Sequence, residues 1–365
     1  MIIKFSKEVS LGIYISIFLI SGVLLIGINK YNSRFVKLRY FTSMSLLVIL
    51  STLRYGVGTD FFTYRSIFQR LSKMTLKEYI DINGINEMGV YVLNKFAGLL
   101  GGFSGYLFLT STIIIGCTYY VIYREREKIS IAVGLILFLF LDYTMSFNII
   151  NQCIAVSIIF IGYRFIIEKN IIKFLIVILI AALFHSTAIL IFPVYFLWNK
   201  RREGLIHPIL LIIFLIILIL VIVNYQKVID FISTFNGMEA YKDYIYTDNR
   251  GKNRDLIIKI LILIICSLRY KKLVCYDNNN KLYILMLFIS VIISFTGFTS
   301  PFVKRVGLYF SIVEILILPS FIETFKSKKE KRLLSYCAIL SSILLFILVS
   351  YILGQGHVIP YRIMI

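Results

Sequence analysis

The stretch LLSYCAILSSILLFILVSYIL, residues Leu333 to Leu353, carries no charged residue over 21 positions. A helix needs roughly 20 apolar residues to cross the hydrocarbon core of a bilayer, which is about 30 Å thick. Similar apolar stretches recur along the chain, at Val9 to Ile28, Leu205 to Val223 and Leu282 to Phe295. In lipid, every backbone polar group must be paired within its own segment. These runs therefore predict membrane-spanning helices rather than barrel strands.

The composition of the whole chain indicates the same class. Of the 365 residues, 59% are hydrophobic and only 16% are charged, whereas soluble domains carry about 25% charged residues. We therefore predict a single all-α integral membrane domain over residues 1–365, a polytopic transmembrane helix bundle of about twelve spans. The net charge of +20 lies in short loops between apolar runs. We therefore expect the chain to lie in a lipid bilayer and to bind no nucleic acid.

The distribution of charge among the loops predicts the orientation of the chain. Six short loops together hold 21 Lys or Arg residues and 6 Asp or Glu residues, and the alternating loops hold 15 and 11. Loops rich in Lys and Arg face the cytoplasm. We place there the loops Lys30–Arg39, Arg124–Lys128, Glu168–Lys173, Asn199–Gly204, Arg269–Lys281 and Lys326–Arg332. Both termini and the remaining loops are then expected on the outer side of the cytoplasmic membrane.

The two longest hydrophilic segments, residues 54–88 and 224–255, are both predicted as external loops. Within the first, Tyr64 to Ile80 has the pattern of an amphipathic helix lying on the membrane surface. The apolar segment Gly89 to Gly105 follows. A full crossing by this segment would put every later basic loop outside, so we predict a re-entrant or interfacial helix on the outer side.

Signatures of soluble enzymes, such as a phosphate-binding glycine loop or a zinc-binding HExxH, are missing from the sequence. Polar residues instead gather where predicted spans end on the outer side. Polar groups at membrane depth are costly and are usually functional. They form six clusters: Arg54 to Asp60 with Tyr64; Glu87 to Gly89; Asp142 with Asn148, Asn151 and Gln152; His185 to Thr187; Lys304 and Arg305 with Tyr309; and Pro360 to Arg362.

The first cluster contains both a cation and an acid. Arginine can bind phosphate oxygens with two hydrogen bonds, which suits an anionic lipid headgroup. Gly56 and Gly58 permit backbone conformations closed to other residues. Asp60 is expected either to pair with Arg54 or to act on a substrate.

In order along most of the chain, these residues resemble the EpsG family, a branch of the Wzy-type polysaccharide polymerases. The resemblance rests on Arg54, Val57, Gly58, Asp60 and Tyr64; Glu87, Gly89, Leu93 and Asn94; Gln152 and Ala155; Lys173, Phe174, Phe184, His185, Ala188 and Pro193; and Arg305, Tyr309 and Phe310. One position departs from the pattern, because the family often has Arg where this chain has Asn151.

The resemblance implies an integral membrane glycosyltransferase with a GT-C-like bundle. Such enzymes join oligosaccharide repeat units carried on undecaprenyl diphosphate, at the outer (periplasmic) face of the bacterial cytoplasmic membrane. The donor and the acceptor would both be lipid-linked oligosaccharides, and a chain-length regulator is a further candidate partner. The product would be capsule, O-antigen or exopolysaccharide. Neither a cofactor nor a metal ion is expected if arginines stabilise the leaving diphosphate.

From these residues we assign expected roles. Arg54 and Arg305 would bind the diphosphate. Asp60 or Glu87 would remove the proton of the acceptor hydroxyl, with His185 as the reserve base. Tyr64, Gln152 and Tyr309 would orient sugars.

Two other functions remain open at this point. A flippase for the same lipid-linked unit would also be basic and polytopic, but it should carry charges along mid-span cavities. A membrane acyltransferase that modifies the glycan could also use His185.

Overall fold

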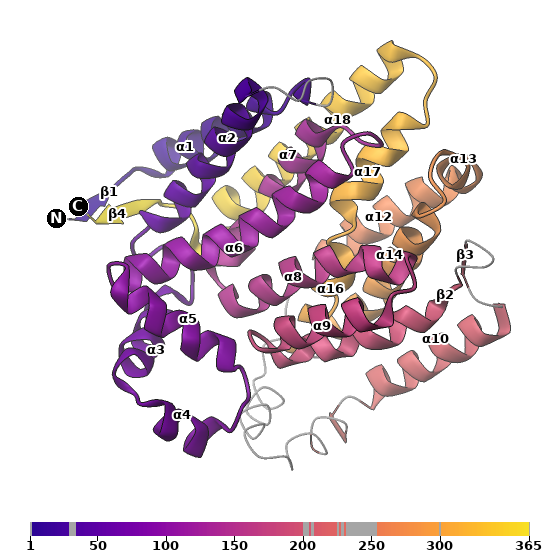
Figure 1. The fold of residues 1–365 in the computed structure, drawn as a ribbon. Helices are drawn as coiled ribbons and strands as arrows, with labels where there is room; N and C mark the ends of the chain where they lie inside the picture. Colours follow the sequence, from indigo (N-terminus) through magenta and orange to yellow (C-terminus); the bar gives the residue numbers. More distant parts are fainter. Residues whose placement is uncertain are drawn as a thin grey trace. The chain divides into compact units, whose positions relative to one another are not determined.

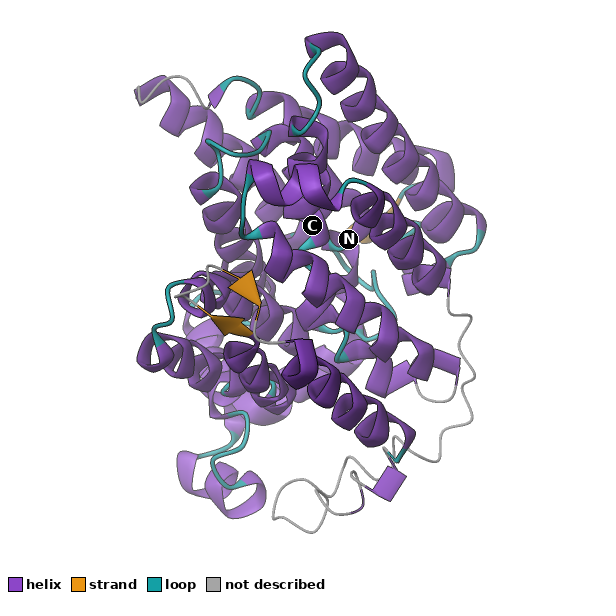
Figure 2. Cartoon of the chain, turned by 90° about the vertical axis from the view of Figure 1, so that its right-hand side faces the viewer, coloured by secondary structure: helices purple, strands orange, loops and turns teal. Residues whose placement is uncertain are grey.

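In the computed structural model of the chain, helices make up most of the described residues (Figures 1 and 2). The structure describes residues 2–28, 34–199, 204–205, 208–224, 226–227, 230, 254–298 and 301–364. Most of the predicted external loop 224–255 therefore lies outside the described residues, as does most of the predicted loop Asn199–Gly204. Strands are confined to short pieces, drawn in orange in Figure 2.

Seven helices in the described part of the chain are long and apolar enough to cross a membrane, which confirms the predicted all-α polytopic class. They cover Lys7–Leu24, Arg34–Thr52, Phe103–Arg124, Ile150–Ile167, Asn280–Phe298, Val303–Glu323 and Lys328–Ile352. Shorter apolar helices cover Ile131–Leu141, Ile171–Ala182, Ser186–Leu197, Pro208–Val221 and Leu256–Leu268. Each of these helices coincides with an apolar segment that the sequence predicts as a membrane span. The number of about twelve spans stays a prediction, because the shorter helices do not reach the required length.

The chain forms two compact units, each assembled from separate segments. Unit 1 comprises Met1–Met74, Gly89–Ile161 and Leu318–Ile365, and unit 2 comprises Thr75–Met88 and Gly162–Ile317. The residues of two helices, α8 (Ile150–Ile167) and α17 (Glu314–Glu323), are divided between the units. The prediction of one membrane domain stays a prediction.

In unit 1, α7 (Ile131–Leu141) is buried along nearly its whole length. It packs between α1 (Lys7–Leu24) and α18 (Lys328–Phe346), while α2 (Arg34–Thr52) packs against α1 and α6 (Phe103–Arg124). The core aromatic rings gather around Phe18, whose centroid lies 5.1 Å from Phe140 and 5.4 Å from Tyr143. On α18, apolar side chains at helical spacing stay exposed, which suits contact with lipid: Leu333, Tyr336, Leu340 and Leu344.

In unit 2, α9 (Ile171–Ala182) packs against the 3₁₀ helix η3 (Ser186–Leu197), and α12 (Arg254–Leu268) packs against α14 (Asn280–Ser294). The 3₁₀ helix η6 (Phe295–Phe298) and the short helices α15 (Pro301–Arg305) and α16 (Leu308–Ser311) follow α14 and pack against it. The remaining elements are α4 (Leu76–Asn83), α10 (Pro208–Val223), α13 (Tyr270–Tyr276), and the paired strands β2 (Trp198–Asn199) and β3 (Gly204–Leu205).

The predicted amphipathic helix Tyr64–Ile80 is divided in two. Helix α3 (Phe61–Lys73) ends, and α4 begins after Thr75. Thr75 is extended, and its side chain accepts a hydrogen bond from the backbone N–H of Glu78. The Glu78 carboxylate in turn accepts from the backbone N–H of Thr75 at 2.7 Å. This capping box starts a new helix where periodicity alone predicted continuity.

The segment predicted as re-entrant, Gly89–Gly105, forms α5 (Met88–Leu99) and the start of α6. At 1.5 Å per residue, the 12 residues of α5 span about 18 Å, which is less than the hydrocarbon core. Its placement in the membrane stays a prediction.

The two ends of the chain meet in unit 1. Strand β1 (Ile2–Lys4) pairs antiparallel with β4 (Arg362–Met364), and the markers for both termini lie together in Figure 1. The π-helical turn η7 (Ile347–Ile352) and the 3₁₀ turn η8 (Gln355–His357) connect α18 to β4.

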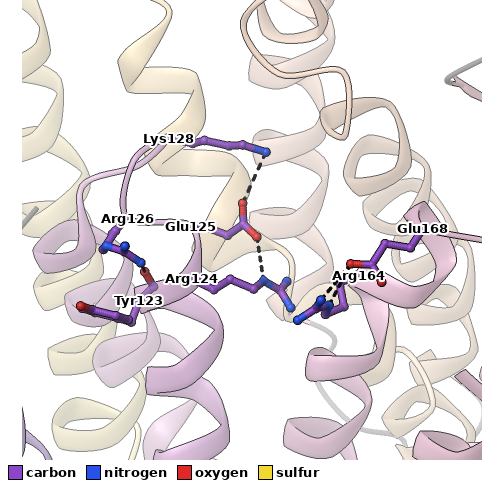
Figure 3. A network of polar contacts seen from close by, with 7 residues as sticks. All are labelled: Tyr123, Arg124, Glu125, Arg126, Lys128, Arg164 and Glu168. Atoms are coloured by element: carbon purple, nitrogen blue, oxygen red, sulfur yellow. Dashed lines mark hydrogen bonds and ion pairs between the residues drawn. The ribbon is translucent and has the colours of Figure 1, made fainter. Parts of the chain in front are cut away.

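Charged side chains at helix ends are neutralised locally (Figure 3). At the end of α6, Glu125 accepts from Arg124 at 3.0 Å and lies 3.7 Å from the Lys128 ammonium. Arg164, predicted within a span, pairs with Glu168 one turn later at 3.0 Å.

Candidate functional site

Arg54 follows directly on α2 and is buried, with 3% of its surface exposed. Its guanidinium carbon lies 4.1 Å from the centroid of the Phe147 ring. Within the described part of the chain, Nε and Nη1 of Arg54 are buried and have no hydrogen-bond partner. Burial lowers the pKa of Arg54 to about 10, so the side chain remains a cation at neutral pH. A buried cation without a partner carries a large desolvation cost, which an anionic ligand would offset.

The loop after Arg54 is tightly folded around two glycines. Gly56 and Gly58 have φ values of +60° and +102°, in the region that glycine enters readily and other residues rarely adopt. A Cβ atom at Gly58 would lie 2.7 Å from the backbone oxygen of Phe147. The Gly58 N–H donates to the backbone oxygen of His357 at 3.0 Å. Only glycine fits this close approach of three segments.

Asn148 joins the third predicted cluster to the first. Its Oδ1 accepts from the backbone N–H of Thr59 at 2.6 Å, and its Nδ2 donates to the Gly356 oxygen at 3.2 Å. The Thr59 hydroxyl lies 2.9 Å from Asp60 Oδ1 and 3.0 Å from Asn148 Oδ1. The expected pairing of Asp60 with Arg54 is absent among the ion pairs of the described residues, and the alternative, in which Asp60 acts on a substrate, stays a prediction.

Tyr64 and Gln152, both predicted to orient sugars, lie in unit 1 as well. The Tyr64 ring on α3 stacks on Tyr106 of α6, with centroids 6.4 Å apart. The Tyr106 hydroxyl donates to Oδ1 of Asn151 at 3.2 Å. Gln152 is buried in the first turn of α8. At the position where the resemblance leads one to expect Arg, this chain therefore has an amide that accepts from a tyrosine.

In unit 2, Glu87 and His185 form a hydrogen-bonded pair. Oε1 of Glu87 lies 2.9 Å from Nδ1 of His185, and the backbone N–H of Ser186 donates to the same oxygen at 3.4 Å. The side chains are 24% and 23% exposed, so both are sheltered yet reachable. His185 is extended between the end of α9 and the start of η3, and Glu87 has a φ of +49° between α4 and α5. Such a φ is rare outside glycine and often marks a functional position.

Tyr309 supports the loop that carries His185. Its hydroxyl lies 3.1 Å from that of Thr187, and its backbone oxygen accepts from the hydroxyl of Tyr163. The Tyr309 side chain is fully buried, which suits a role in holding the loop; its predicted contact with sugar stays a prediction. Arg305 ends α15, one turn before Tyr309, and is partly exposed.

The predicted site residues thus fall into two groups. Unit 1 contains Arg54, Asp60, Tyr64 and Gln152, and unit 2 contains Glu87, His185, Arg305 and Tyr309. Sequence reasoning missed the aromatic surroundings of Arg54, formed by Tyr14, Tyr143 and Phe147. Aromatic residues in apolar segments usually belong to the hydrophobic core, so only the structure shows that these three lie around Arg54.

The model of the EpsG family matches residues 37–363. The match includes every predicted site residue of both groups. No curated protein and no solved structure matches the chain.

Proposed function

Since the chain belongs to the EpsG family and is a multi-pass membrane protein, we propose that it is a polysaccharide polymerase. It would join oligosaccharide repeat units carried on undecaprenyl diphosphate by glycosyl transfer. The high Lys and Arg content of the six short loops predicted to face the cytoplasm supports a site on the opposite, outer face of the bacterial cytoplasmic membrane. The product would be capsule, O-antigen or exopolysaccharide.

The hydrogen bond between Glu87 and His185 is the observation that carries this proposal. When Nδ1–H donates to the carboxylate, Nε2 is left as the neutral, basic nitrogen of the ring. A histidine oriented by a carboxylate in this way is the usual arrangement of a general base. In the reaction, the acceptor hydroxyl oxygen would bond to the anomeric carbon of the donor, while Nε2 of His185 takes the proton of that hydroxyl. The bond from that carbon to the diphosphate would break, and the diphosphate would leave with the electron pair.

The departing diphosphate gains negative charge, which cations can stabilise. We assign this role to Arg54 and Arg305. Arg54 supports it best, because its guanidinium is charged and buried, and its Nε and Nη1 have no hydrogen-bond partner in the described part of the chain. Tyr64, Gln152 and Tyr309 would orient the sugars, and Asp60 is the alternative base.

Deletion of the protein from its host tests the reaction. Loss of a polymerase should leave single repeat units on the lipid carrier at the outer face, with no polymer. Units trapped at the inner face would instead identify a flippase, and full-length chains lacking acyl groups would identify an acyltransferase. Either of these two results would overturn the proposal.

Complementation of the deletion strain tests the arginines. Arg54→Ala and Arg305→Ala should each abolish polymer and leave single lipid-linked units. Arg70→Ala, which removes an exposed cation from α3, serves as the control and should restore polymer. Full-length polymer with both Arg54→Ala and Arg305→Ala would refute their role.

A further inference from the structure

The last residues of the chain help to build the surroundings of Arg54. The backbone N–H of Tyr55 donates to the oxygen of Arg362 at 2.8 Å, and Arg54 forms an isolated bridge with Ile363. On the other side of the same segment, β4 pairs with β1, and the backbone N–H of Tyr361 donates to the Ser10 hydroxyl at 2.8 Å. The C-terminal segment is therefore tied to the start of the chain and to the Arg54 loop.

Side chains on an extended segment alternate between its two faces. Arg54 stands opposite Ile363, so Arg362 lies on the other face, where its Nη1 is 3.8 Å from a Cβ built on Gly56. Arg362 is thus not a second cation for the Arg54 site. Tyr361, two residues from Ile363, shares the face of Arg54 and is buried.

Three buried tyrosines around Arg54 use their hydroxyl protons on backbone carbonyls. The hydroxyl of Tyr361 donates to Leu50 at 2.6 Å, that of Tyr143 to Leu47 at 2.6 Å, and that of Tyr14 to Val358 at 3.0 Å. Leu50 lies in the last turn of α2, where helical carbonyls lack a partner within the helix. Tyr361 thereby holds the end of the helix that precedes Arg54.

Each of these hydroxyl protons is already donated to a backbone carbonyl, which limits how the hydroxyl groups can interact with Arg54. Each oxygen retains only acceptor capacity, and these oxygens favour the charged form of the guanidinium, which partly opposes the effect of burial. Nε and Nη1 of Arg54 form no hydrogen bond to these tyrosines in the described structure, and burial still outweighs the effect of the tyrosines on the pKa of Arg54. These two donors therefore remain available for an incoming oxyanion.

We propose that Tyr361, together with Tyr143 and Tyr14, positions Arg54 in an anion site, and that the C-terminal segment is thus part of the machinery that binds the lipid-linked diphosphate. This inference rests on the proposed function. A Tyr→Phe substitution tests it, because the ring and its packing are kept while the hydroxyl is removed.

The experiment measures binding of undecaprenyl diphosphate and of undecaprenol, which lacks phosphate, to the full-length protein in nanodiscs of neutral lipid. Wild-type protein should prefer the diphosphate, and Arg54→Gln should lose this preference. Tyr361→Phe should bind the diphosphate about ten-fold more weakly, with unchanged binding of undecaprenol. Tyr91→Phe is the matched control, because its buried hydroxyl also donates to a backbone carbonyl, that of Met74, and it should bind as wild type.

The possible failures are distinguishable. If Tyr361→Phe binds the diphosphate as wild type does while Arg54→Gln does not, the positioning role is refuted and the role of Arg54 stands. If wild-type protein binds undecaprenol equally well, the anion site itself is refuted, whereas the polymerase proposal is still decided by the glycans on the carrier. Should Tyr361→Phe not purify as a folded protein, Tyr143→Phe makes the same test.

Discussion

Nδ1 of His185 lies 2.9 Å from Oε1 of Glu87, although 97 residues separate the two along the chain. The contact joins the turn after α9 to the segment between α4 and α5. The contact places Nδ1 of the ring against the carboxylate, and in the proposed reaction the other nitrogen, Nε2, would act on the substrate. The roles of the two residues are therefore coupled.

This coupling predicts the effects of substitution. Glu87→Gln and His185→Ala should each lower polymer synthesis by about 10² to 10⁴-fold, because both remove the oriented base. The double variant should be little worse than either single one, since the residues act as a unit. Polymer yield from purified lipid-linked units provides the measurement. Asp81→Asn removes an exposed carboxylate of α4 and should leave the rate unchanged. Additive losses in the double variant would contradict a shared role.

Arg54 should lower the stability of the protein while serving its function. Burial lowers its pKa from the ordinary arginine value to about 10 in the folded state, so the folded state disfavours the cation. Between these values the unfolded chain binds more protons, and the free energy of unfolding rises with pH. Below about pH 10 the buried cation lowers the free energy of unfolding by its full amount, on the order of a few kcal/mol.

Arg54→Met should therefore raise the melting temperature in detergent by several degrees at neutral pH while abolishing polymer, because Met keeps apolar contact with Phe147. The gain should shrink as the pH is raised above about 10. Arg54→Lys keeps a cation at this position and should not produce the gain. A lower melting temperature for Arg54→Met would contradict this account.

Gly58 should tolerate no side chain. Its φ is +102°, and a Cβ would lie 2.7 Å from the Phe147 oxygen and 3.0 Å from Asn148 Oδ1. Gly58→Ala should therefore destabilise the protein by at least about 1–3 kcal/mol and displace the loop that carries Thr59 and Asp60. Thermal melting and polymer yield should both fall. Gly98→Ala in α5 meets no atom within 4 Å and should leave both unchanged or slightly improved.

The pairing of β1 with β4 requires both chain ends to lie on one side of the membrane. Ile2→Cys and Met364→Cys place thiols at exposed positions of these strands, in a background without the five native cysteines. A membrane-impermeant maleimide should label both variants in intact spheroplasts. Lys329→Cys, in a predicted cytoplasmic loop, should be labelled only after permeabilisation. Labelling of the two ends from opposite sides would contradict the strand pairing.

The sequence alone predicted the features that depend on residues close together in the chain. Long uncharged stretches predicted membrane helices, because a bilayer leaves backbone groups no other partner. Gly56 and Gly58 indicated positions where the backbone is free to adopt unusual conformations, since only glycine enters them readily. The break at Thr75 also had a local signal, the Thr75–Glu78 capping box, which helical periodicity concealed.

The tertiary structure decided which distant residues meet. Whether Arg54 pairs with Asp60 depends on Phe147 and on tyrosines from α1, from the 3₁₀ helix η2 (Tyr143–Phe147) and from the C-terminal segment. The contact of Glu87 with His185 likewise depends on how separate helices pack. Such contacts result from side-chain packing between segments far apart in the sequence, for which hydropathy and loop charge hold no information.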